Sequence, residues 1–134
     1  MSLLLDTSAC IAVMNDRPHA RARLKHAYVR RDVVFVSTIV LFELWFGVVK
    51  SSRQTHNANR LSDFLSEMQI LEFDGDDARV AATVRLSLMR AGTPIGSYDL
   101  LIASQAIRHE FSLVTANTRE FSRVPDLRLE NWEA

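Results

Sequence analysis

Residues 3–8 read LLLDTS, and this stretch decides the fold. Three consecutive leucines are typical of a strand that is buried on both faces. Asp6, Thr7 and Ser8 follow at once, and such short polar side chains begin helices. Because strands buried on both faces occur in parallel sheets covered by helices, the N-terminus predicts the first strand-to-helix step of an α/β fold.

The same alternation of apolar and amphipathic segments continues along the chain. It predicts strands at 3–5, 33–36, 70–73 and 113–115, and a short edge strand within 127–130. It also predicts helices over 9–14, 18–30, 38–50, 76–90 and 98–109, and a helix after the polar break 51–55 that includes 61–68. Ser97 is expected to cap the last of these helices. This order predicts a single domain over residues 1–134, with a central, mostly parallel, twisted sheet of four to five strands and helices on both faces.

The composition is that of an ordinary globular protein, with 48% hydrophobic and 24% charged residues. The formal net charge is zero, which argues against a protein that coats nucleic acid through bulk charge, although a few arginines can still meet phosphates locally. Cys10 is the single cysteine, so no intrachain disulfide can form, and a cytoplasmic location is expected. The apolar run 34–49 is shorter than the roughly 20 residues of a membrane-spanning helix, and we expect no membrane association.

Several polar residues lie where a parallel sheet binds its ligands, at the carboxyl ends of the strands. Asp6 follows the first predicted strand, and Asn117 comes just after the fourth. Glu43 lies one to two turns into its predicted helix, and Asp99 lies in the first turn of another. Glu43 is also the only charged residue between positions 33 and 49, where a carboxylate needs an arginine, water or a metal ion as its partner.

Each of these residues also has a purely structural interpretation. Asp6 can be a helix cap, and Asp99 can complement a helix dipole. Asn117 can be a turn residue, and Glu43 can be half of a buried ion pair. As a set, however, they are oxygen ligands whose mutual repulsion a divalent cation would relieve. All-oxygen ligation favours Mg²⁺ or Mn²⁺ over Zn²⁺, and the four histidines lack the spacing of a zinc site.

Four segments carry a resemblance to a known family. They are LLLDTSACI (3–11), STIVLFELWFG (37–47), GSYDLLIASQA (96–106) and LVTANTREFSRVPDLRLENW (113–132). In this order and spacing they resemble VapC-type toxins with a PIN domain, over nearly the whole chain. The resemblance implies a single PIN-like α/β domain and a metal-dependent endoribonuclease that hydrolyses RNA phosphodiester bonds. It also implies a VapB-type antitoxin as partner, a homodimer, a transfer or ribosomal RNA substrate, and contact with operator DNA only through the antitoxin.

The resemblance also assigns roles to individual residues. By their positions in these segments, the metal-binding acids are Asp6, Glu43 and Asp99. Asn117 falls where many PIN domains carry a fourth acid, and it is included in the catalytic set. Ser8 and Thr115 resemble the family's supporting hydroxyls, which hold a water or a metal-binding carboxylate. Glu120 is close enough in sequence to supply a carboxylate.

Two other functions stay open. One is a PIN-like domain without catalytic activity that serves as a binding module, although the three acids argue against it. The other, less well supported, is a metal-dependent phosphatase of the haloacid-dehalogenase type. Those enzymes place a second acid two residues after the first, and here Ser8 stands at that position.

The apolar faces of residues 41–46 and 61–65 contain more large side chains than one small core obviously needs. These side chains belong either to the core or to a surface that binds the antitoxin or a second copy of the chain.

Overall fold

This structure of the chain, a computed structural model, describes residues 1–133. The described part contains a five-stranded sheet with the order β3-β2-β1-β4-β5, and every neighbouring pair of strands is parallel. The strands are β1 (Ser2–Leu5), β2 (Val33–Ser37), β3 (Gln69–Leu71), β4 (Ser112–Val114) and β5 (Leu129–Glu130). The predicted α/β fold with a parallel sheet is confirmed.

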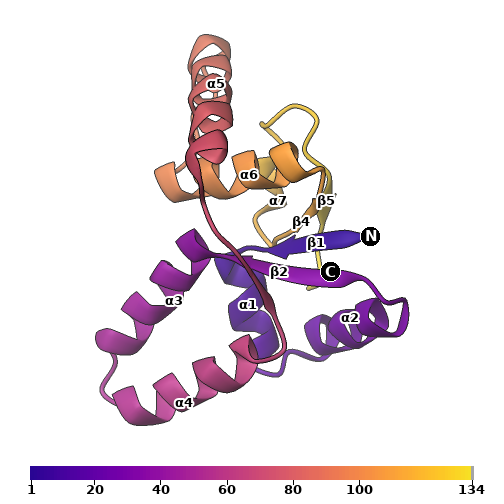
Figure 1. The fold of residues 1–134 in the computed structure, drawn as a ribbon, viewed down its shortest axis with the longest axis vertical. Coiled ribbons are helices and arrows are strands. Elements are labelled where there is room, and N and C mark those ends of the chain that lie inside the picture. Colours follow the sequence, from indigo (N-terminus) through magenta and orange to yellow (C-terminus); the bar gives the residue numbers. More distant parts are fainter. Residues whose placement is uncertain (134) are drawn as a thin grey trace.

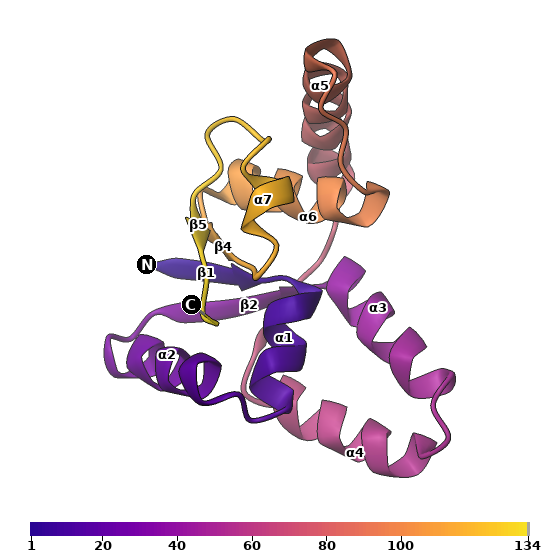
Figure 2. The same cartoon turned by 180° about the vertical axis from the view of Figure 1, so that it is seen from behind.

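Seven helices connect these strands within residues 1–133. They are α1 (Thr7–Met14), α2 (Pro18–Val29), α3 (Thr38–Val49), α4 (Gln54–Leu65), α5 (Gly75–Ala91), α6 (Ser97–His109) and α7 (Thr118–Phe121). Helices α1 to α4 lie on one side of the sheet, whereas α6 and α7 cover the other side and α5 projects beyond them (Figures 1 and 2).

Local sequence explains where several helices begin. The side chain of Ser37 accepts a hydrogen bond of 3.0 Å from a backbone N–H of α3 and thereby caps that helix. Asp74 and Asp77 form a reciprocal capping box at the start of α5. The expected Ser97 cap is wrong, because Gly96 occupies the cap position and Ser97 is the first residue of α6.

Two further predictions differ from the structure. Met68 was expected on the helix of 61–68, but α4 ends at Leu65 and Met68 reaches the core from the turn that follows. Helix α7 is absent from the predicted pattern, because four residues are too few to show a helical period.

The centre of the core is β1, which lies between β2 and β4. Leu3, Leu4 and Leu5 are each at most 1% exposed, as the opening run of leucines predicts. The apolar run 34–49 divides into β2 and α3, also as predicted. Within residues 1–133, no helix combines the length and apolar character needed to cross a bilayer.

The strand order places a switch point beside β1. From β1 the chain builds β2 and β3 outward on one side, and it then returns to add β4 on the other side of β1. Ligands of open α/β sheets bind at the carboxyl ends of the strands that flank such a point. Here these are the ends of β1 and β4, which Asp6 and Thr115 follow directly.

Candidate active site

Asp6 is held rigidly at the end of β1. It is only 4% exposed, and its Oδ1 accepts hydrogen bonds from the Ser8 hydroxyl (2.7 Å) and the Ala9 N–H (2.9 Å). Its Oδ2 accepts one of 2.5 Å from the Thr115 hydroxyl, which links the ends of β1 and β4. Burial raises the pKa of Asp6, although the bonds from Thr115, Ala9 and Ser8 oppose the rise.

Glu43 reaches the same end of the sheet from α3. Its Oε1 accepts a hydrogen bond of 2.8 Å from the hydroxyl of Thr7, the first residue of α1. No arginine or lysine forms an ion pair with Glu43 among residues 1–133, so the buried ion pair considered for this residue is not found there. Thr7 was not singled out from the sequence, since it read only as part of a helix start.

Asp99 lies in the first turn of α6, and three other carboxylates act on its pKa. Burial, followed by the negative charges of Glu120, Asp6 and Glu43, together raises its pKa to about 6. Four carboxylates from four separate parts of the chain therefore lie within electrostatic reach of one another. We call Asp6, Glu43, Asp99 and Glu120 the acid cluster.

Glu120 supplies a carboxylate next to Asp99, as its place in the sequence allowed, and Asn117 lies beside Glu120. Glu120 accepts hydrogen bonds from the Gly96 N–H (2.7 Å) and from the Asn117 side-chain amide (2.8 Å), and these bonds lower its pKa. Asn117 thus contacts the cluster through Glu120. The backbone N–H of Asn117 in turn donates to the Thr115 hydroxyl at 2.9 Å.

Gly96 is a second residue that sequence reasoning missed. A Cβ atom built on it would lie 3.6 Å from both Asp99 Oδ2 and Glu120 Oε1. Its position on the loop before α6 is what brings its N–H to Glu120. The only sequence signal is its place two residues before Tyr98-Asp99, and such a glycine is unremarkable in a loop.

The donor chemistry of the acid cluster fits a hard divalent cation. All four side chains offer oxygen, and their mutual repulsion would be relieved by positive charge between them. Among residues 1–133, however, no three His, Cys, Asp or Glu side chains are grouped closely enough to enclose an ion. That spacing suits Mg²⁺, which usually keeps several waters and binds one or two carboxylates directly, and it does not suit the closed four-ligand shell of a structural zinc site.

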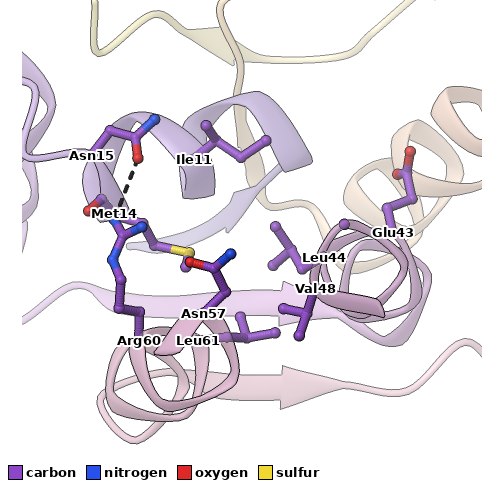
Figure 3. A pocket seen from close by; sticks show the side chains of 10 residues that line it. Ile11, Met14, Asn15, Glu43, Leu44, Val48, Asn57, Arg60 and Leu61 are labelled. Atoms are coloured by element: carbon purple, nitrogen blue, oxygen red, sulfur yellow. Dashed lines mark hydrogen bonds between the residues drawn. The ribbon is translucent and has the colours of Figure 1, made fainter. Parts of the chain in front are cut away.

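A groove between α1, α3 and α4 leads to the acid cluster at Glu43 (Figure 3). Its volume is about 210 Å³, and its walls are formed by Ile11, Met14, Asn15, Glu43, Leu44, Gly47, Val48, Asn57, Arg60 and Leu61. Arg60 is held on one wall, because its guanidinium donates to the Met14 carbonyl (2.6 Å) and to Asn15 Oδ1 (3.3 Å). The groove is therefore mainly apolar, and the carboxylate of Glu43, at its edge, points away from the other lining side chains (Figure 3).

The large apolar residues of α3 divide between core and surface. Leu44 is 7% exposed and packs in the core, whereas Phe42, Trp45 and Phe46 are 55%, 38% and 58% exposed. The Phe42 ring contacts the edge of Tyr98, the residue before Asp99. An exposed aromatic surface therefore lies next to the acid cluster.

Comparison with known proteins gives matches over nearly the full length. The profile of the PIN domain family matches residues 3–127. The ribonuclease VapC2 of Rickettsia felis is 38% identical over 133 residues, which cover 99% of each chain. The tRNA(fMet)-specific endonuclease VapC of Salmonella typhimurium is 35% identical over 133 residues, which cover 98% of each chain.

Solved structures of VapBC proteins give the same result as the sequence comparison. A chain in VapBC2 from Rickettsia felis, bound to a DNA fragment from its promoter, superposes with a TM-score of 0.93 at 38% identity, over 98% of this chain and 99% of that one. A chain in the DNA-bound VapBC of Salmonella typhimurium gives a TM-score of 0.91 at 35% identity, over 98% of both. The resemblance seen in the four sequence segments is confirmed, and the chain belongs to the PIN-domain family, in its group of VapC ribonucleases.

Proposed function

We propose that this chain is the toxin of a toxin–antitoxin pair and acts as a metal-dependent endoribonuclease in the cytoplasm. The observation that carries the proposal is the convergence of three carboxylates, Asp6, Glu43 and Glu120, on Asp99 from distant parts of the chain. Relatives named as VapC ribonucleases, at 35–38% identity over nearly the whole length, support the reaction class. A transfer RNA is the favoured substrate class, because one of these relatives is named as a tRNA endonuclease.

In this proposal Asp6 and Asp99 hold a Mg²⁺ or Mn²⁺ ion, with Glu43 and Glu120 binding it directly or through water. When bound, such an ion lowers the pKa of a coordinated water and neutralises charge that develops on the phosphoryl oxygens. The family position of the fourth acid is then supplied by Glu120 rather than by Asn117.

The remaining residues of the site orient these acids. Ser8 and Thr115 fix the two oxygens of Asp6, and Thr7 fixes Glu43. Asn117 and the Gly96 N–H hold Glu120. Such preorganisation matters because a carboxylate that must reorient during the reaction adds to the barrier.

The groove and the exposed aromatic residues of α3 suit protein partners. We propose that a VapB-type antitoxin lays apolar side chains in the groove of Figure 3 and directs a cation at Glu43 and its neighbours. The related structures are of VapBC bound to DNA, and this chain is proposed to meet operator DNA in the same way, through its antitoxin. A homodimer is also proposed, with exposed apolar surface of α3 available for it.

The test is cleavage of transfer RNA by the purified chain in Mg²⁺ or Mn²⁺. We expect cleavage that stops on chelation and in Asp6→Asn, while Asp126→Asn, a matched change at an exposed aspartate, cleaves normally. Circular dichroism checks that both variants are folded. Full activity of Asp6→Asn would remove Asp6 from the proposed site.

The same experiment separates the alternatives. An inactive binding module would bind RNA and leave it uncut at every metal concentration. A phosphatase would release phosphate from a small phosphomonoester and spare the internal bonds of RNA. Glu43→Gln adds a further check, since we expect it to lower activity without unfolding the protein.

A further inference from the structure

One segment of this electrically neutral chain is strongly basic. Residues 17–31, which read RPHARARLKHAYVRR, contain six of the 16 lysines and arginines and none of the 16 acids. They correspond to helix α2 and its two ends. The net charge of the chain does not reveal this basic segment, because acidic residues elsewhere in the chain balance its positive charge.

The basic side chains of α2 point outward. Ala20, Leu24 and Ala27 turn one side of the helix into the core, where each is at most 4% exposed. Four basic residues follow one another along a flank at positions i, i+4, i+7 and i+11, and all are exposed: His19, Arg23, His26 and Arg30. Lys25 is exposed on the outer side. A 12-residue helix carries such a row over about 18 Å.

Ion pairs neutralise three of the six cations in this segment. Arg17 pairs with Glu133 (3.6 Å), Arg21 with Asp16 (3.4 Å), and Arg30 with Asp32 (2.7 Å). Three other cations, Arg23, Lys25 and Arg31, have no carboxylate within ion-pair distance in the described part of the chain. These three are available to an external anion.

Helix α2 lies apart from the acid cluster. Its C-terminal end leads into the amino end of β2, whereas the acids gather at the carboxyl ends of the strands (Figure 2). The four residues of β1 alone span about 13 Å between these two ends. A short oligonucleotide placed at the acids therefore leaves α2 free, and a folded RNA is large enough to contact both.

We infer that α2 is a second RNA-binding surface, which docks the phosphate backbone of a folded RNA while the acid cluster meets the bond to be cut. The inference rests on the proposed ribonuclease function and names the part of the protein that selects a structured substrate. Phosphate binding by arginine and lysine releases counterions from the RNA, so the unpaired cations Arg23, Lys25 and Arg31 contribute affinity even on a neutral protein.

The first test is binding without catalysis. In an Asp99→Asn background with EDTA, fluorescence anisotropy measures the Kd for a labelled transfer RNA. We expect R23Q/K25Q to weaken binding about tenfold and to flatten the slope of log K against log salt by about 1 to 2. The control R79Q/R90Q removes two exposed α5 arginines that form no ion pair within residues 1–133, and it should shift Kd less than about twofold.

The second test compares two substrates in the active protein. We expect R23Q/K25Q to lower the ratio of kcat/KM for transfer RNA to kcat/KM for a short single-stranded oligonucleotide about tenfold, mainly through KM, while the control leaves the ratio unchanged. Equal effects of the two double variants in either test would overturn the docking surface. So would an α2 that binds an acidic peptide and not RNA. Absence of cleavage by the parent protein would instead refute the proposed function, and the binding test would still decide about α2.

Discussion

Two groups of acidic residues in this molecule differ in how the repulsion between their carboxylates is relieved. At the start of α5, Asp74, Asp76 and Asp77 gather around Arg108, with N–O distances of 3.3, 3.4 and 2.9 Å. At the carboxyl ends of β1 and β4, the acid cluster has no such partner, since none of its four members forms an ion pair among residues 1–133.

The pKa values follow this difference. A hydrogen bond from the Asp77 backbone and the charge of Arg108 hold the pKa of Asp74 below its usual value. Burial and three neighbouring carboxylates raise the pKa of Asp99 to about 6. The acids at the start of α5 are thus neutralised from within the chain, whereas the acids proposed to serve catalysis repel one another in a way that an external cation would relieve.

The largest effect is expected for Asp99→Asn. Removing one carboxylate from the acid cluster should lower kcat for RNA cleavage by about 10³-fold, because the proposed metal loses a principal ligand. The melting temperature should stay the same or rise, since a repelling charge is gone. A cleavage assay and a thermal melt measure both. Asp76→Asn in the paired group is the control and should leave the rate unchanged, and a large loss of folding in Asp99→Asn would make Asp99 a structural residue.

The complementary change is Asp77→Ala in the paired group. Asp77 is fully buried and accepts from Arg108 (2.9 Å) and Gln105 (3.3 Å). Its loss should reduce the free energy of unfolding by about 3 kcal/mol, because it leaves buried polar groups without partners. Urea denaturation measures this. The kcat per folded molecule should be retained, and a selective loss of kcat would show that the two groups are coupled.

Divalent ions should stabilise the folded protein by binding at the acid cluster and not at the acids around Arg108. At 10 mM Mg²⁺ and a Kd near 1 mM, ligand linkage adds about 1.4 kcal/mol, or about 5 °C in melting temperature. NaCl at matched ionic strength is the reference. The increase should disappear in Asp99→Asn and persist in Asp76→Asn. An equal increase in both variants would indicate binding elsewhere.

The smallest expected effect is the change in the free energy of unfolding with pH, measured without divalent ions. Because the folded-state pKa of Asp99 is raised to about 6, the folded protein binds this proton before the unfolded chain does, and stability increases as the pH falls from about 7 to 4. The gain is about 1 kcal/mol, since solvent screens a half-buried carboxylate. Asp74 acts in the opposite direction, because its lowered pKa gives stability that is lost below about pH 4. Urea titrations at pH 4 to 8 should show a larger rise in the parent protein than in Asp99→Asn, which keeps the raised pKa of Asp6.

The sequence predicted the fold, and it singled out Asp6, Glu43 and Asp99 with Glu120 as a further possible carboxylate, because both inferences depend on local patterns and segments. Buried strands read as unbroken apolar runs, and Asp6 and Asp99 are placed by the ends of elements that such runs predict. Glu43 stood out because it is a lone charge in an apolar helix.

The partners of these acids could not be predicted in the same way. Thr7 contacts a residue 36 positions away, and the N–H of Gly96 contacts one 24 positions away. Contacts between residues so far apart in the chain produce no pattern of spacing that could be recognised in the sequence. The choice between Asn117 and Glu120 likewise depends on α7, a single helical turn too short to be recognised.

The position of β1 in the middle of the sheet also bears on how the protein is made. Its neighbour β4 begins at Ser112, and the bond between Thr115 and Asp6 joins residues 109 positions apart. A ribosome must therefore synthesise the chain through Glu120 before all four acids can meet. We expect nascent chains and products truncated before Glu120 to be harmless, so that the cell that makes this enzyme is exposed to its activity only after translation has passed Glu120.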